Sequence, residues 1–176
     1  MHKNLSEILI TKEQIEKKVK ELAFNITRDY QGKDIFFIGV LKGSFLFISE
    51  LVKNIKLETN IDFMMISSYE GRQSSGMVRI LLDLKQPIDG KDVIIVEDIV
   101  DTGLTINYLM KTLKTRKPRS IEVCTLLNKP SCRKINVNLK YIGFNIPDKF
   151  VVGYGLDYKE YYRNLPYIGV LRDEAI

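Results

Sequence analysis

Short apolar runs alternate along the chain with segments of helical period, and this alternation restricts the possible folds more than any other feature. Residues 35–40 (Ile-Phe-Phe-Ile-Gly-Val) and 93–96 (Val-Ile-Ile-Val) are continuous apolar runs, typical of strands buried on both faces. Each is followed by a predicted helix, over 45–52 and 106–113. Strands that alternate with helices predict an α/β fold with a mostly parallel twisted sheet and helices on both faces.

The same two periods predict the remaining elements. A first helix is expected over 13–28, where apolar residues recur at helical spacing and Thr11 precedes them as an N-cap. Further strands are expected, in chain order, over 60–67, 78–83, 121–127, 141–146 and 150–154. The first two of these flank a polar segment, so we expect them to form a long hairpin arm. Ligands of parallel α/β sheets bind outside the carboxyl ends of the strands.

The length and composition predict one soluble domain over residues 1–176, with a balance of apolar and charged residues typical of globular proteins. No apolar run approaches the roughly 20 residues of a membrane helix, and the N-terminal segment does not resemble a signal peptide. We therefore expect a cytoplasmic protein without membrane contact, in which Cys124 and Cys132 are reduced thiols. The net charge of +5 suits either nucleic acid or an anionic small molecule and does not decide between them.

Chemically informative side chains follow the apolar run at 93–96. The carboxylates of Glu97, Asp98 and Asp101 lie within five residues, and such close like charges repel unless a cation or hydroxyl donors face them. The next four residues, 102–105, are Thr-Gly-Leu-Thr, which provide two hydroxyls, a tight turn and the start of a helix. Backbone N–H groups at a helix N-terminus form a phosphate site. Acids beside a phosphate site indicate a protein that binds a phosphorylated sugar, although a capped helix with solvated acids also fits the pattern.

The segment 96–105, Val-Glu-Asp-Ile-Val-Asp-Thr-Gly-Leu-Thr, resembles the signature of type I phosphoribosyltransferases in their hypoxanthine-guanine form. By this resemblance Asp101 faces N7 of the purine and is the candidate general base, and Mg²⁺ lies near the ribose hydroxyls. Some members carry lysine where this chain has Leu104, which should matter little because that position contributes mainly backbone. The resemblance assigns the ribose and 5-phosphate to Glu97, Asp98, Asp101, Thr102, Gly103, Leu104 and Thr105.

Four further segments match the same family in order along the chain. The resemblance assigns pyrophosphate to Leu41, Lys42, Gly43 and Arg163, with a peptide before the lysine that can be cis. It assigns the purine to Lys129, which donates to O6, to Phe150, which stacks, and to Val151 and Asp157. It assigns the metal to Glu97, Asp98 and Asp157, and a mobile closing loop to Ser68, Tyr69 and the polar residues up to Gly76. Taken alone, each segment also fits an ordinary surface lysine, core aromatic residue or hairpin tip.

The resemblance implies a type I phosphoribosyltransferase fold with a small hood subdomain. It implies purine salvage: transfer of a phosphoribosyl group from phosphoribosyl pyrophosphate to N9 of hypoxanthine or guanine, giving IMP or GMP. Mg²⁺ is the expected cofactor, although Mn²⁺ suits the same oxygen ligands. A homodimer or homotetramer is expected, and no nucleic-acid partner. The alternative is a nucleic-acid-binding regulator on the same fold, which the retained Asp101, Lys129 and Asp157 disfavour.

Overall fold

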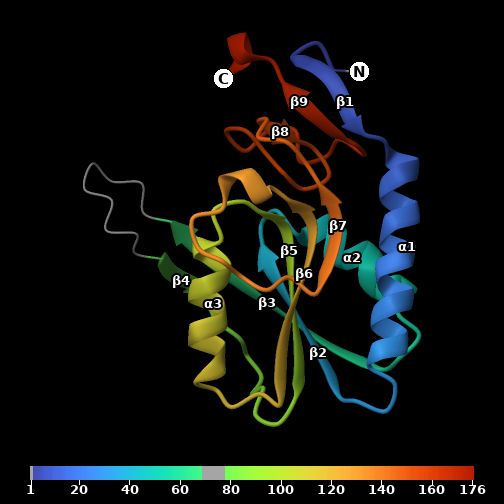
Figure 1. Cartoon of the computed structure of the whole chain (residues 1–176), viewed down its shortest axis with the longest axis vertical. Coiled ribbons are helices and arrows are strands. Elements are labelled where there is room, and N and C mark those ends of the chain that lie inside the picture. Colours follow the sequence, from blue (N-terminus) through green and yellow to red (C-terminus); the bar gives the residue numbers. More distant parts are fainter. Residues whose placement is uncertain (1, 69–77) are drawn as a thin grey trace.

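The computed structural model describes residues 2–68 and 78–176 (Figure 1). Its elements in chain order are β1 Leu5–Ile10, α1 Lys12–Asp29, β2 Ile35–Leu41, α2 Phe45–Asn54, β3 Thr59–Ser68, β4 Val78–Leu82, β5 Asp92–Val100, α3 Leu104–Lys114, β6 Ser120–Asn128, β7 Tyr141–Asn145, β8 Val151–Val152 and β9 Ile168–Leu171, with short 3₁₀ helices at Pro130–Cys132 and Asp173–Ala175.

The main sheet has six strands in the order β4-β3-β2-β5-β6-β7. Five of them run parallel, and β4 returns antiparallel along β3. The strands of the centre are almost wholly buried, as the continuous apolar runs predicted. The expectation of a mostly parallel sheet is therefore confirmed.

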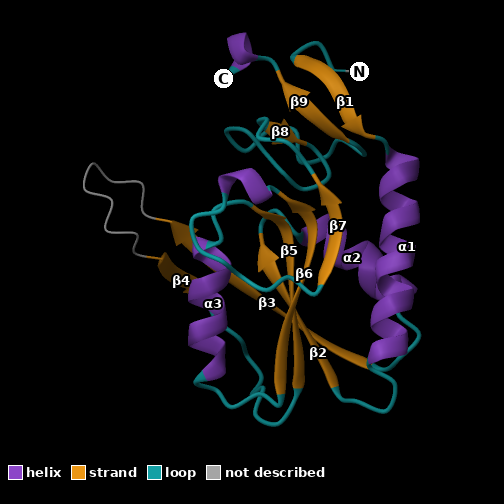
Figure 2. Ribbon diagram, in the orientation of Figure 1, coloured by secondary structure: helices purple, strands orange, loops and turns teal. Residues whose placement is uncertain are grey.

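Helices cover both faces of this sheet, as expected. One buried cluster joins α1 and α2 to one face through residues such as Ile26, Phe47 and Ile94. A second cluster joins α3 to the opposite face through Leu109 and Ile95. Figure 2 shows α3 on the other side of the sheet from α1 and α2. The adjacent residues Ile94 and Ile95 thus belong to different layers, because successive side chains of a strand point to opposite faces.

The first helix begins where its sequence signals indicate. The Thr11 hydroxyl accepts a hydrogen bond from the Gln14 N–H, and the Gln14 side chain accepts one from the Thr11 N–H. This capping box satisfies two N–H groups that would otherwise lack partners. Among the described residues no helix has the length and apolar character needed to cross a membrane.

A separate three-stranded sheet, in the order β1-β9-β8, forms the small hood subdomain. Its strands are antiparallel, and β1 pairs with β9 although they lie more than 150 residues apart in the chain. Figure 1 shows this sheet beyond the carboxyl ends of β5, β6 and β7. The hood therefore lies over the sheet edge at which the ligand site was expected.

Two sequence predictions need correction. The strand expected over 150–154 is only β8, because Gly153 and Gly155 have φ of 102° and Tyr154 has φ of 48°, which turn the chain out of the extended conformation. The strand indicated by the apolar run at 93–96 is longer than this run, because β5 continues to Val100 and keeps its pairing with β6. Glu97 and Asp98 therefore lie on a strand rather than in a loop.

Candidate active site

A cavity of about 190 Å³ opens at the carboxyl ends of the central strands. It lies where β2, β3 and β5 end and where α3 begins. Its lining contains Val40, Leu41, Gly43, Ile66, Glu97, Asp98 and Thr105. Five of these seven residues were assigned to the site from the sequence. The fold therefore brings three segments to one place: the acidic pair of Glu97 and Asp98, the phosphate turn at 102–105 and the lysine turn at 41–43.

The two carboxylates of β5 are costly in their ionised form in this cavity. Glu97 is buried, and its Oε2 atom has no hydrogen-bond partner among the described residues. Burial raises the pKa of Glu97 well above its ordinary value, and the charge of Asp98 adds to the rise. Burial also raises the pKa of Asp98 to about 6, although the Ile99 N–H donates to its Oδ1 at 2.9 Å and favours the charged form. Both shifts would be reversed by a cation or by hydroxyl donors in the cavity.

These carboxylates fit a magnesium ion in part. The unpartnered Glu97 oxygen is the kind of hard oxygen ligand that Mg²⁺ prefers, and Mg²⁺ is usually held by one or two carboxylates together with substrate phosphates and water. The charge of Asp157 raises the pKa of Asp98, so the third predicted ligand lies in the same region. The described residues nevertheless contain no group of three or more metal-ligating side chains. A complete site would therefore need oxygens from a substrate.

The turn between β5 and α3 is held by backbone hydrogen bonds from a later segment of the chain. The carbonyl oxygen of Thr102 accepts hydrogen bonds from the N–H groups of Lys134 and Ile135, at 3.0 and 3.1 Å. Gly103 has φ of 81°, and a Cβ atom there would lie 2.6 Å from the Ile135 carbonyl oxygen. The position therefore requires glycine. The first N–H groups of α3 begin at Leu104. The N-cap residue Gly103 offers them no side chain, and the Leu104 N–H makes only a long hydrogen bond, at 3.4 Å, to Thr102 Oγ1. The next N–H groups of the helix are therefore available to a ligand.

The lysine turn packs between β5 and the turn that follows β8. The Leu41–Lys42 peptide bond is cis. A Cβ atom on Gly43 would overlap the carboxylate of Asp98, and one on Gly155 would overlap the Gly43 carbonyl oxygen. Gly43 is therefore enclosed between the end of β5 and the turn that follows β8, and only glycine permits so close an approach.

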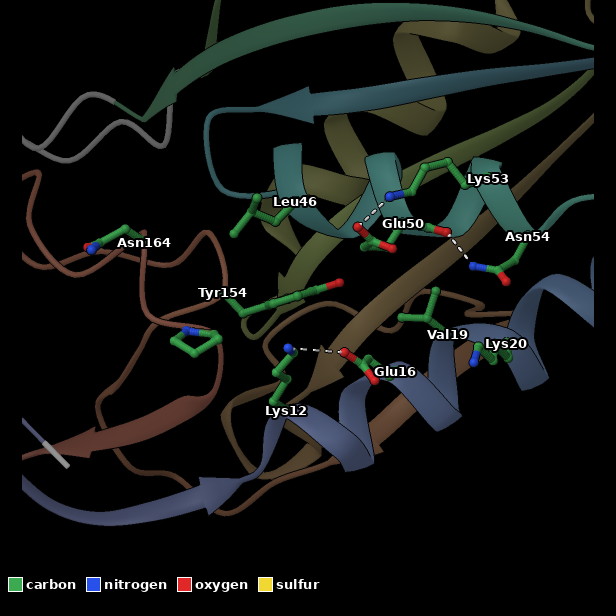
Figure 3. A pocket seen from close by; sticks show the side chains of 11 residues that line it. Lys12, Glu16, Val19, Lys20, Leu46, Glu50, Lys53, Asn54, Tyr154 and Asn164 are labelled. Carbon is green, nitrogen blue, oxygen red and sulfur yellow. Dashed lines mark hydrogen bonds and ion pairs between the residues drawn. The ribbon is translucent and has the colours of Figure 1, made fainter.

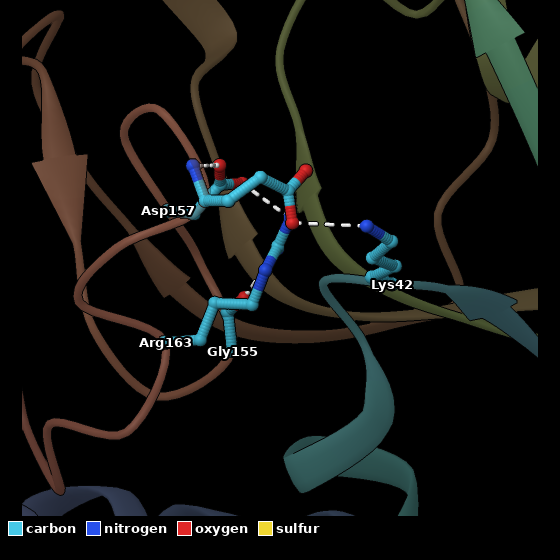
Figure 4. A network of polar contacts seen from close by, with 5 residues as sticks. Lys42, Gly155, Asp157 and Arg163 are labelled. Carbon is cyan, nitrogen blue, oxygen red and sulfur yellow. Dashed lines mark hydrogen bonds and ion pairs between the residues drawn. The ribbon is translucent and has the colours of Figure 1, made fainter.

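Four charged side chains form a network beside this turn (Figure 4). Arg163 forms an ion pair with Asp157 at 2.9 Å and donates a hydrogen bond to the carbonyl oxygen of Gly155 at 2.9 Å. Glu160 accepts from Lys42 at 2.9 Å and from Arg163 at 3.3 Å. The structure thus brings Lys42 to Asp157 and Arg163, which lie more than 110 residues further along the chain. Glu160 was missed by sequence reasoning, and its position three residues before Arg163 was the available signal.

The residues predicted to bind the purine lie in the hood and at the end of β6. Lys129 is buried, its N–H donates to the Val100 carbonyl oxygen at 2.9 Å, and its amine lies 3.6 Å from the Asp148 carboxylate. Phe150 is 42% exposed, and its ring meets that of Tyr158 edge to face, with centroids 5.5 Å apart. Val151 is buried within β8. A partly exposed aromatic ring and a buried amine are the two kinds of group that suit a planar, polar heterocycle.

The predicted closing loop is only partly described. Ser68 is the last residue of β3 and pairs with Val78 of β4, so the hairpin arm expected from the sequence is present. Tyr69 and the residues up to Gly76 lie outside the described residues. The two predicted reduced thiols, Cys124 and Cys132, are both free, and Cys124 is buried.

A larger cavity of about 620 Å³ lies between α1, α2 and Tyr154 (Figure 3). Its wall mixes apolar side chains such as Leu46 with lysines and glutamates that pair with one another, as Lys12 does with Glu16 and Lys53 with Glu50. None of the residues assigned to the site from the sequence lines this cavity. Size alone therefore does not identify the site, whereas the unpartnered carboxylate oxygen and the phosphate turn point to the smaller cavity.

Comparison with known proteins agrees with this location. Residues 6–159 match the family described as phosphoribosyl transferase domain. The chain is 51% identical over 176 residues to a hypoxanthine-guanine phosphoribosyltransferase of Staphylococcus aureus strain Mu50, covering 99% of this chain and 98% of the relative.

Solved structures give the same result. A crystal structure of a hypoxanthine phosphoribosyltransferase from Staphylococcus aureus superposes with a TM-score of 0.95 at 51% identity, covering 99% of this chain and 95% of that one. The hypoxanthine phosphoribosyltransferase from Trypanosoma cruzi, in complex with the product IMP, superposes with a TM-score of 0.94 at 42% identity and covers 100% of this chain and 99% of that one. The similarity therefore extends over the sheet, the site and the hood.

Proposed function

The chain belongs to the phosphoribosyltransferase family, and from this premise we propose that it is a hypoxanthine-guanine phosphoribosyltransferase of purine salvage. It transfers the 5-phosphoribosyl group of phosphoribosyl pyrophosphate to N9 of hypoxanthine or guanine and releases pyrophosphate. The observation that carries the proposal is one cavity in which the carboxylate pair of β5, the start of α3 and the lysine turn meet. The proposal treats residues 1–176 as one catalytic domain.

In the proposed reaction a new bond forms between purine N9 and C1 of the ribose, and the bond from C1 to the pyrophosphate oxygen breaks. Positive charge develops on the sugar and negative charge on the leaving group. Glu97 and Asp98 would hold the ribose hydroxyls and face the sugar's developing positive charge. Asp101 would accept the proton that leaves N7 of the purine, an assistance typically worth about 10²–10⁴-fold in rate.

The phosphate groups are assigned to backbone and cations. The N–H groups from Asp101 to Thr105, together with the Thr102 and Thr105 hydroxyls, would bind the 5-phosphate at the positive end of α3. Lys42, on the turn with Leu41 and Gly43, and Arg163 would bind the pyrophosphate, and their charges stabilise it most as it departs. Magnesium, held through Asp157 and near Glu97 and Asp98, would supply further neutralisation of the phosphate charge.

The purine is assigned to the hood side of the cavity. The Lys129 amine would donate to O6, and an adenine amino group at this point would leave two donors facing each other. Phe150 would stack on the ring, the backbone of Val151 would bind the edge of the ring, and Asp157 completes this side. Ser68 and Tyr69 would begin a loop that closes over the site and keeps water from capturing the sugar cation.

Location and assembly are part of the same proposal. We place the enzyme in the cytoplasm, and we propose a homodimer or homotetramer. An apolar groove of about 300 Å³ on α2 and β3 supports an interface with a second copy, since Phe45 and Ile61 are each 40% exposed in its wall.

The test is pyrophosphate release from phosphoribosyl pyrophosphate and Mg²⁺ with hypoxanthine, guanine, xanthine, adenine or uracil. Release is expected with hypoxanthine and guanine and not with adenine or uracil. Release with adenine alone would contradict the role of Lys129. Tight binding of phosphoribosyl pyrophosphate without release for any base would contradict the enzyme and favour a regulator.

A further inference from the structure

One carboxylate lies between the two cations assigned to pyrophosphate. The same oxygen, Oε2 of Glu160, accepts from Lys42 Nζ at 2.9 Å and from Arg163 Nη2 at 3.3 Å. In Figure 4 a dashed line leads from Lys42 into the network of polar contacts around Arg163 and Asp157. Both N–H donors are thus engaged by a negatively charged oxygen of the protein itself.

The backbone holds Glu160 in this place. Its φ is 66°, a conformation that residues other than glycine adopt rarely, and its N–H donates to Asp157 Oδ2 at 2.9 Å. The flanking Tyr158 and Tyr161 exchange two backbone hydrogen bonds, at 3.2 and 3.0 Å, which close a tight turn. Asp157, a predicted metal ligand, and Glu160 are therefore carried by one turn, and Glu160 is directed at the cations.

We propose that Glu160 is an internal competitor of pyrophosphate: its carboxylate occupies Lys42 and Arg163 when the leaving-group site is empty and is displaced when pyrophosphate binds. This inference rests on the proposed function, which assigns these two cations to pyrophosphate. A phosphoryl oxygen and the Glu160 carboxylate compete for the positive charge of Lys42 and Arg163, and a negatively charged oxygen already at these distances opposes the approach of another. Glu160 thus weakens the retention of the product without contacting the reacting atoms.

The attraction between Glu160 and the two cations is weak enough for pyrophosphate to displace the carboxylate. The side chains of Glu160 and Lys42 are 65% and 53% exposed, so water screens their attraction. A doubly charged phosphate that also contacts the buried part of the site displaces such a partner. Removal of the carboxylate charge should tighten pyrophosphate binding by about two- to tenfold, the range of one or two exposed ion pairs.

The test is calorimetric titration of inorganic pyrophosphate, with Mg²⁺, into the wild-type protein and Glu160→Gln, which keeps the shape and removes the charge. Glu21→Gln is the matched control, because Glu21 also forms an exposed ion pair, with Lys18 at 2.8 Å, and lies on α1. We expect two- to tenfold tighter binding to Glu160→Gln, a similar fall in KM for phosphoribosyl pyrophosphate, and no change for Glu21→Gln.

Equal affinity of wild-type protein and Glu160→Gln would overturn the inference, as would weaker binding to the variant, which would mean that Glu160 arranges the cations for the ligand. Absence of pyrophosphate binding to either protein would also overturn it. Failure of the proposed function would look different: pyrophosphate would bind, yet no purine would release it from phosphoribosyl pyrophosphate.

Discussion

At the scale of single residues, Asp101 has the most direct proposed role. It follows the last residue of β5 and precedes the phosphate turn, so its carboxylate can face a purine while the backbone beside it binds phosphate. Asp101→Asn should lower kcat by about 10²–10⁴-fold, the usual contribution of a general base. Phosphoribosyl pyrophosphate should still bind, because the backbone donors remain. Steady-state kinetics and direct binding of the sugar phosphate check both parts, and undiminished turnover would remove Asp101 from the mechanism.

Asp92 determines a pH dependence of stability away from the site. Its buried carboxylate accepts from Arg119 Nε at 3.0 Å and from Ser120 Oγ at 2.7 Å. The hydrogen bond from Arg119 holds the pKa of Asp92 below its usual 3.8 despite burial. Because the folded-state pKa is depressed, this carboxylate stabilises the fold above about pH 4 and stops doing so as the pH falls through its folded-state pKa.

Asp92→Asn should therefore lower the free energy of unfolding at pH 7 by about 1–3 kcal/mol, the usual value for a hydrogen bond to a charged group. The difference from wild type should shrink in acid below pH 4. Urea denaturation of both proteins at several pH values measures it. Asp89→Asn, at a nearby surface position, serves as the control, and a deficit that stays constant into acid would contradict this account.

At the scale of elements, the turn before α3 depends on a glycine for two reasons that can be separated. Gly103 and Gly90 have φ of 81° and 71°, so alanine at either position meets the same backbone strain, about 1–2 kcal/mol. A Cβ atom on Gly103 would also contact the Ile135 carbonyl oxygen, whereas one on Gly90 would meet no atom within 4 Å.

Gly103→Ala should consequently destabilise the protein more than Gly90→Ala and should also weaken the binding of phosphoribosyl pyrophosphate, which Gly90→Ala should leave intact. Chemical denaturation and ligand titration of the two variants measure the difference. Equal losses of stability with unchanged binding in both would show that the Ile135 contact does not shape the phosphate turn.

The elements that sequence reasoning found and missed differ in how local their signals are. The central strands β2 and β5 were predicted because burial on both faces requires continuous apolar residues. β1 and β9 were missed, because β1 has four exposed or half-exposed residues of six, its pairing with β9 contains irregular register, and its partner lies near the other end of the chain. A local sequence pattern cannot indicate that a strand pairs with another strand so far away in the chain.

The site divides in the same way. The acids and the phosphate turn form one contiguous segment with a family signature, so they could be named from the sequence. Glu160 was missed, because its position three residues before Arg163 does not reveal its contact with Lys42, which is 118 residues away and is brought to it by the fold. The end of β5 was also placed too early, since its apolar run stops at Val96, whereas pairing with β6 keeps Glu97 in the sheet.

At the scale of the whole molecule, the apolar groove on α2 and β3 should be buried between copies. Ile61→Asp would place a charge in this groove and should shift the protein towards monomer, as measured by light scattering during size-exclusion chromatography. Phe24→Asp is the matched control, because Phe24 on α1 is a 67% exposed aromatic residue outside the groove. A wild-type monomer, or an unchanged oligomer in Ile61→Asp, would contradict this interface.

The pairing of β1 with β9 also fixes the order in which the two halves of the site are completed during synthesis on the ribosome. Once the chain has emerged as far as Asn145, all six strands of the main sheet and the phosphate turn can assemble. At that stage β1 still has no partner, and Phe150 and Val151 have not been made. A nascent chain can therefore present the surface for the sugar phosphate well before it can accept a base, and a premature stop codon before Ile168 would leave that surface without a hood.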